Sequence, residues 1–120
     1  MTVNLSSKLL FSKGLWILKP LAYDEIDQKV VKVLKQYPET RVAIGGHTDT
    51  QEAPRLKLQE LSSKRAWAIY GYLARRGIAR SRMSVKGWGP DQPIDSNATA
   101  VGRERNRRVE VVIFGRKQVK

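Results

Sequence analysis

The segment from Leu58 to Arg76 carries the strongest helical periodicity in the chain, and it constrains the fold more than any other segment. At about 100° per residue, one group of apolar side chains falls within roughly 120° on one side of such a helix. This group consists of Leu58, Leu61, Ile69, Tyr72 and Leu73. Arg65 falls in the middle of the same apolar face, at about 40° from Leu61. Because a guanidinium stays charged and is costly to bury alone, the pattern predicts a buried arginine with an anionic partner.

The stretch before this helix predicts where the partner lies. Residues 41–44 are apolar and β-prone, and they run into the pair Gly45-Gly46. This arrangement indicates a buried strand that opens into a loop. Asp49 follows at the mouth of that strand and is the nearest acidic candidate. We therefore expect Asp49 to pair with Arg65, and we expect the function of the chain to reside at these two residues.

The rest of the chain predicts further strands and one more helix. We expect strands over 3–10, 84–89 and 107–114, a helix over 20–37, and a loop over 89–101. Within the 20–37 helix, one face should be buried because its apolar residues recur at helical spacing; these are Ile26, Val30, Val33, Leu34 and Tyr37. The resulting order, β-α-β-α-β-β, predicts an α+β fold: a two-layer sandwich with a mixed sheet.

The length of 120 residues predicts a single domain over 1–120. We expect order over 3–115, with Met1-Thr2 and 116–120 frayed at the ends. No apolar run approaches the ~18 residues that a membrane-spanning helix needs. The sequence therefore predicts no membrane span in this chain.

Side-chain chemistry argues against catalysis. The chain has no cysteine and a single histidine, His47. Disulfides, thiolate metal sites, cysteine nucleophiles and multi-histidine metal centres are thereby excluded. We expect no metal, no cofactor and no enzymatic activity, since acid–base or nucleophilic catalysis would need groups that the chain does not offer.

The charge balance points to anionic partners. Lys and Arg number 23 against 11 Asp and Glu, which gives a net charge of +12. Nucleic acid, anionic lipid headgroups and an acidic cell-wall polymer all fit such a chain. Basic clusters such as 75–76, 107–108 and 116–117 support the nucleic-acid alternative. Against it, the sequence contains no recognised nucleic-acid-binding motif, and aromatic residues do not alternate with the basic runs.

Several separated blocks occur in an order that resembles one known family. They are Gly46-His47-Thr48-Asp49, Leu61-Ser62 with Arg65-Ala66, Gly87-Trp88-Gly89, and Asn106-Arg107-Arg108-Val109-Glu110. Together they resemble the C-terminal domain of the outer-membrane protein A family, and the similarity covers nearly the whole chain. That family has the same β-α-β-α-β-β sandwich.

The resemblance implies non-covalent binding of peptidoglycan through its peptide stem, commonly through meso-diaminopimelate. It implies that Asp49 and Arg65 hold the charged ends of that residue, with Arg107 nearby. Thr48 and Leu58 fall at the same ligand-binding site by their positions in the motifs. The resemblance also implies a periplasmic domain, part of a longer envelope protein that it anchors to the wall, with other envelope proteins as further partners.

The chain departs from the family pattern around this site. Leu58 stands where the family usually carries an asparagine, and Glu52 and Pro54 lie in the stretch where a glycine is common. The loop from Asp49 to Leu61 is also about one residue longer than in relatives, and the first loop reads Ser12-Lys13-Gly14. The charged pair is thus retained, whereas the neutral polar groups around it are reduced.

Two alternatives remain open at this level. Asp49 and Arg65 can form a structural ion pair that fixes the loop to the helix. The domain can also be a basic polyanion-binding, nucleic-acid-binding or protein-interaction module on a degenerate version of the fold.

Overall fold

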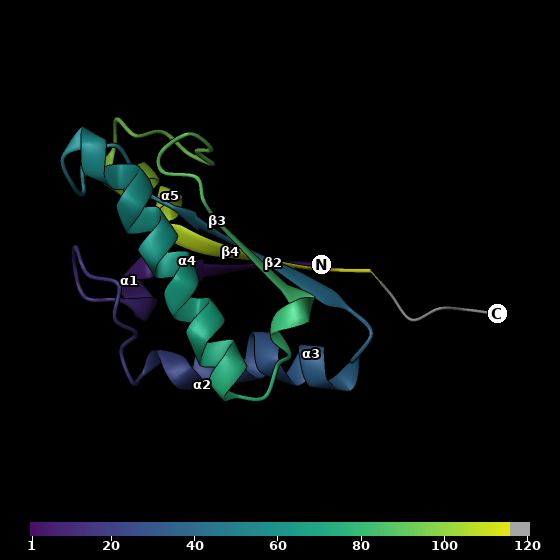
Figure 1. The fold of residues 1–120 in the computed structure, drawn as a ribbon. Coiled ribbons are helices and arrows are strands. Elements are labelled where there is room, and N and C mark those ends of the chain that lie inside the picture. Colours follow the sequence, from purple (N-terminus) through teal and green to yellow (C-terminus); the bar gives the residue numbers. More distant parts are fainter. Residues whose placement is uncertain (116–120) are drawn as a thin grey trace.

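A computed structural model of the 120-residue chain describes residues 1–115 (Figure 1). Its helices and strands alternate along the chain. They are β1 (Thr2–Ser6), α1 (Ser7–Leu10), α2 (Ala22–Ile26), the π-helical η1 (Asp27–Val31), α3 (Lys32–Gln36), β2 (Arg41–His47), the 3-10 turn η2 (Arg55–Lys57), α4 (Leu58–Arg75), the 3-10 turn η3 (Arg80–Arg82), β3 (Met83–Gly87), α5 (Ala100–Asn106) and β4 (Arg108–Phe114).

The four strands form one mixed sheet in the order β1-β4-β2-β3. β4 lies at the centre and pairs antiparallel with both β1 and β2, whereas β2 and β3 run parallel. In this register Ile44 lies opposite Val111, and Gly46 lies opposite Val109. The predicted α+β architecture with a mixed sheet is confirmed.

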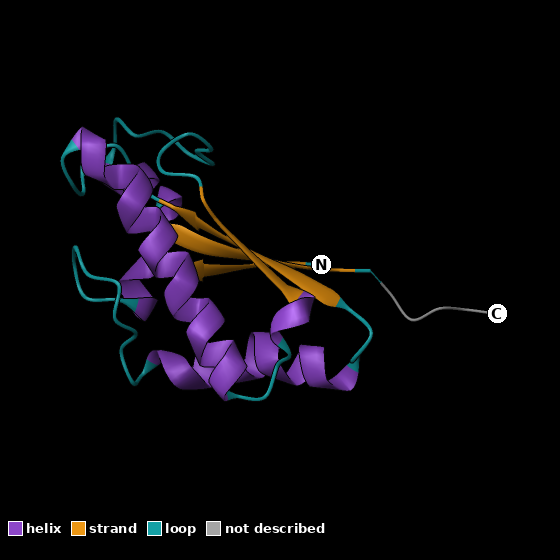
Figure 2. Ribbon diagram, in the orientation of Figure 1, coloured by secondary structure: helices purple, strands orange, loops and turns teal. Residues whose placement is uncertain are grey.

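The sheet buries one face, which α4 crosses, and α2 to α3 lie beside α4 (Figure 2). Side chains alternate along the strands: Val42 and Ile44 are buried, whereas Ala43 between them is only half-buried. The predicted apolar face of α4 is buried in full, and Arg65 in its middle is 2% exposed. A single covered face is the basis of the two-layer sandwich.

The first strand is shorter than the predicted 3–10. β1 ends at Ser6, which pairs with Arg108, the first residue of β4. The β1–β4 ladder ends there, and the chain turns into α1, where Leu10 is buried and Leu9 is exposed. At the start of the chain, Thr2 pairs with Val112 and the Met1 ammonium donates to the Ile113 carbonyl at 2.9 Å. Residues 116–120 lie outside the described part of the chain.

The predicted 20–37 helix forms over Ala22–Gln36, with a π-helical turn in its middle. A π turn adds one residue per turn and so shifts the buried face. Ile26, Val30 and Leu34 are buried as predicted, but Val31 joins them and Tyr37 is 47% exposed. Tyr37 lies one residue past the end of α3, with φ −122° and ψ 76°, so the prediction that it shares the buried face is wrong.

The predicted loop 89–101 is followed by a short helix that the periodicity did not indicate. α5 begins after Thr99, whose Oγ1 accepts from the Gly102 N–H at 3.0 Å. At its other end, the Asn106 side-chain oxygen accepts from the backbone N–H groups of Ile94 and Asp95 at 2.8 and 2.9 Å. The loop is thereby fixed against α5. Within residues 1–115, no helix combines the length and the hydropathy needed to cross a bilayer.

Candidate ligand-binding site

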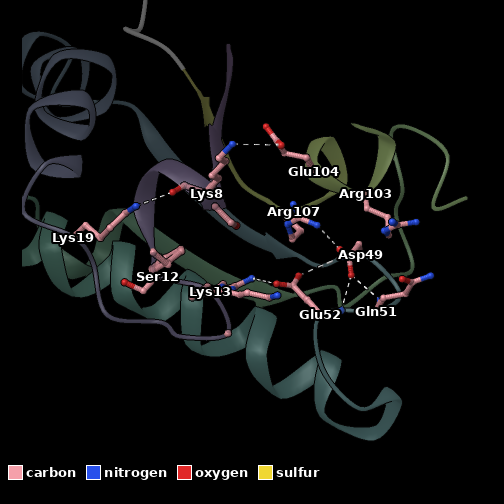
Figure 3. A pocket seen from close by; sticks show the side chains of 14 residues that line it. Lys8, Ser12, Lys13, Lys19, Asp49, Gln51, Glu52, Arg103, Glu104 and Arg107 are labelled. Carbon is pink, nitrogen blue, oxygen red and sulfur yellow. Dashed lines mark hydrogen bonds and ion pairs between the residues drawn. The ribbon is translucent and has the colours of Figure 1, made fainter. Parts of the chain in front are cut away.

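An open cavity of about 520 Å³ lies where the end of β2 meets α1, α4 and α5 (Figure 3). Charged side chains dominate its lining. The lining residues that carry charge are Lys8, Lys13, Lys19, Asp49, Glu52, Arg65, Arg103, Glu104 and Arg107. Three of the five residues predicted for the site, Asp49, Arg65 and Arg107, are therefore together in one cavity.

Asp49 is held at the end of β2 by its own loop. One carboxylate oxygen, Oδ1, accepts from the backbone N–H groups of Gln51 and Glu52 at 2.7 and 2.8 Å. The other, Oδ2, accepts from Arg107 Nη1 at 2.6 Å. The Asp49 side chain is 2% exposed, whereas that of Arg107 is 28% exposed. Asp49 thus stabilises a turn in the loop through Oδ1 and pairs with the Arg107 guanidinium through Oδ2.

Arg65 has a different partner from the one predicted. Its Nη1 donates to Glu52 Oε1 at 2.7 Å, and its Nε donates to the Leu15 carbonyl at 3.0 Å. The prediction that Asp49 pairs with Arg65 is wrong. The reason is the turn: both Asp49 oxygens are already bonded, and the same turn brings the Glu52 carboxylate to the Arg65 guanidinium.

The Arg65–Glu52 pair is almost completely removed from water. The two side chains are 3% and 6% exposed. Burial raises the pKa of Glu52, because it disfavours the charged carboxylate, and the Arg65 cation opposes this shift only in part. The buried ion pair therefore depends on the loop that holds Glu52 against Arg65.

Glu52 is the site residue that the sequence reasoning missed. In the sequence, Glu52 stands out only as a departure from the family pattern in the 50–60 loop. An acid three residues after Asp49, in a loop facing a buried arginine, was the available signal. Four rim residues were missed in the same way, Lys8, Lys13, Lys19 and Arg103, and cationic side chains outnumber acidic ones around the cavity.

The other two predicted residues lie outside the cavity lining. Thr48 is buried, its backbone N–H donates to the Gly89 carbonyl at 2.9 Å, and its hydroxyl has no partner within the described residues. Leu58 is 2% exposed at the start of α4.

His47 lies beside the site but faces the interior. It is 3% exposed, and its ring lies parallel to that of Trp88, with centroids 6.3 Å apart. Burial first, and then the Arg108 cation, lower the pKa of His47 from 6.5 to about 4, and Glu110 opposes the shift. His47 is therefore neutral at neutral pH.

This depressed pKa predicts a loss of stability in acid. Below pH 6.5 the unfolded chain protonates its histidine, whereas the folded chain keeps His47 neutral down to about pH 4. The contribution of His47 is thus fully present above pH 6.5 and is lost as the pH falls to about 4. At about 1.4 kcal/mol per pKa unit, the loss is at most about 3.5 kcal/mol. Urea unfolding at about pH 7 and about pH 4.5 measures it, with His47→Gln as the control. Equal losses in both proteins would contradict the assignment.

Comparison with known proteins identifies the family. The OmpA family profile matches residues 10–107. Outer membrane porin F of Pseudomonas fluorescens is 36% identical over 116 residues, which cover 97% of this chain and 34% of the porin. The peptidoglycan-binding protein ArfA of Mycobacterium tuberculosis H37Rv is 42% identical over 89 residues, which cover 74% of this chain and 27% of ArfA. The chain thus spans about a third or less of these two relatives.

Solved structures agree with this assignment. A putative MotB-like protein from Desulfovibrio vulgaris superposes with a TM-score of 0.84 at 29% identity, over 97% of this chain and 75% of that one. The sequence match spans most of the described residues, and the mixed four-stranded sheet with its helices is shared. The chain belongs to the OmpA family.

Proposed function

We propose that this domain binds peptidoglycan non-covalently through its peptide stem and anchors a longer envelope protein to the cell wall. The observation that carries the proposal is the open cavity whose lining contains the buried Asp49 carboxylate, bonded to Arg107, together with the Arg65 guanidinium, bonded to Glu52. The relative ArfA, which is 42% identical over 89 residues, is named as a peptidoglycan-binding protein. The name of the other relative described above, outer membrane porin F, refers to the cell envelope and supports a periplasmic location for this domain.

The chemistry of the cavity suits an amino-acid centre that carries both charges. A forked guanidinium can bind a ligand carboxylate through two parallel bonds, and a carboxylate can accept from a ligand ammonium. The diaminopimelate residue of a stem peptide offers both groups. We assign the ligand carboxylate to Arg65 and the ligand ammonium to Asp49, with Arg107 bonded to Asp49 in the same cavity. Lys8, Lys13 and Lys19 on the rim favour the remaining carboxylates of the stem.

Sedimentation with purified peptidoglycan sacculi tests this function. We expect the domain to sediment with sacculi at physiological salt and duplex DNA to compete poorly. Asp49→Asn should weaken binding about tenfold or more, because a charge-assisted bond contributes about 1.5–3 kcal/mol. Asp91→Asn is the matched control, since Asp91 is exposed and outside the cavity lining. Equal weakening in both variants would contradict the assigned site.

A second function, general polyanion binding, is favoured by the net charge of +12. It predicts a different salt response: binding to sacculi would vanish by about 200 mM salt, and binding to DNA would show a steep salt slope. A long incubation with sacculi separates out the third possibility. We expect no release of soluble muropeptides, and time-dependent release by pure protein would contradict a binding-only role.

A further inference from the structure

Two buried acids of the cavity, Glu52 and Asp49, already have cationic partners within the domain. Arg65 is held by Glu52 at 2.7 Å, and Asp49 is held by Arg107 at 2.6 Å. The Arg65 and Glu52 side chains are almost completely buried against each other. A ligand carboxylate therefore cannot form its own hydrogen bonds to the Arg65 guanidinium while Glu52 stays bonded to it. Binding at Arg65 therefore requires an exchange of carboxylates.

We propose that the Glu52 carboxylate takes the place of the ligand carboxylate at Arg65. Glu52 blocks this arginine until a free carboxylate of the ligand replaces it. The inference rests on the proposed function and describes how the same site is regulated. Its basis is the position of Glu52 on a loop between β2 and η2, whereas Arg65 lies in the middle of α4. The loop can move away while the helix keeps the arginine in place.

The contacts show which partner is fixed and which can leave. Arg65 keeps a second anchor, the Leu15 carbonyl, and its guanidinium lies 5.4 Å from the Phe11 ring centroid. Within residues 1–115, the Glu52 side chain accepts one further hydrogen bond, a long 3.3 Å bond from the Asp49 N–H to Oε2. Its charged form is also disfavoured by burial, so release into water recovers hydration. Glu52 is therefore the partner that a ligand displaces.

The exchange gives the site a preference for free carboxylates. A neutral carboxamide forms weaker bonds to a guanidinium than a carboxylate does, so it cannot compete with Glu52. Lys13, Lys19 and Arg103 on the rim add to the preference by attracting negative charge. The ligand class is thus a stem peptide whose diaminopimelate carboxylates are not amidated.

The test compares Glu52→Gln with Glu104→Gln. Both changes remove one negative charge from the cavity lining, but only Glu52 contacts Arg65, since Glu104 lies 3.8 Å from Lys8 at the rim. The probe is the tripeptide L-alanyl-γ-D-glutamyl-meso-diaminopimelate, titrated calorimetrically, with thermal unfolding as the folding check. We expect Glu52→Gln to bind about tenfold tighter than wild type, because a site that is closed most of the time loses affinity by its open fraction. Glu104→Gln should change affinity less than about threefold.

A pH series on the wild-type domain gives a second readout that needs no folded variant. The raised pKa of Glu52 predicts that affinity rises as the pH falls from about 7 to about 5, because a protonated Glu52 releases Arg65. Over this range the probe keeps its charges, since its α-carboxylates titrate near 3.3–3.7 and its α-amino group near 7.7–8.0. The charged groups facing Glu52 are Arg65 on α4, Asp49 with its partner Arg107, and the rim cations on α5 and around α1. His47 stays neutral over this range. Glu52→Gln should remove the pH dependence.

Each outcome decides between the two proposals. If wild type binds and Glu52→Gln binds equally or more weakly, Glu52 is a direct ligand contact or purely structural, and the exchange is wrong while the proposed function stands. If neither folded protein binds tripeptide or sacculi, both proposals fail. Should Glu52→Gln not fold, a flat wild-type pH series overturns the exchange and a rising one supports it.

Discussion

Replacing Gly46 with alanine is expected to destabilise the domain by about 3 kcal/mol or more. A methyl group at this position would lie 1.9 Å from the Ser62 carbonyl oxygen, a backbone atom of α4. A backbone cannot swing aside as a long side chain does, so β2 and α4 would have to separate. Because α4 lies on β2 and β3, that separation disturbs the buried face of the sheet. The measurement is urea unfolding of purified Gly46→Ala against wild type.

Gly71→Ala is the matched control, and it should act in the opposite direction. Gly71 lies within α4, and a methyl group there meets only the end of the Arg75 side chain, at 3.8 Å. A glycine inside a helix costs roughly 0.5–1 kcal/mol relative to alanine, so this substitution should stabilise. A Gly46→Ala protein as stable as wild type would mean that the strand and the helix are not packed backbone to backbone.

The second large effect is expected for Arg65→Met. The substitution keeps most of the side-chain volume but leaves the Glu52 carboxylate buried without a cation and the Leu15 carbonyl without its donor. Removing one partner of a buried ion pair costs about 3–5 kcal/mol. At about 4 °C per kcal/mol, the melting temperature should fall by ten degrees or more. Thermal unfolding measures the shift directly.

Two further variants identify the cause of that shift. Lys64→Met removes the neighbouring cation, whose ion pair with Glu60 is about half exposed, and should cost less than about 1 kcal/mol. The double variant Arg65→Met with Glu52→Gln should recover much of the lost stability, because it removes the unpaired charge. If the double variant is no more stable than Arg65→Met alone, the loss comes from packing and not from the buried carboxylate.

Features that depend on local spacing along the chain could be predicted without the structure. Helical periodicity alone located α4, its buried face and the arginine within it, since side-chain direction in a helix follows from position along the chain. The motifs brought Asp49, Arg65 and Arg107 to one expected site, and the cavity contains all three. The α+β order followed from the alternation of strands and helices.

Only the tertiary structure decided which charges meet. Asp49 and Glu52 are three residues apart, and the choice of either as partner for Arg65 depends on how the turn directs each side chain. Arg107 reaches Asp49 because β4 lies beside β2, a pairing of segments far apart in the sequence. Tyr37 likewise faces solvent because α3 ends at Gln36 and the Tyr37 backbone leaves the helical conformation. The contact between Arg107 and Asp49 results from packing between segments far apart in the sequence. The helix and strand propensities of each segment do not specify such a contact by themselves.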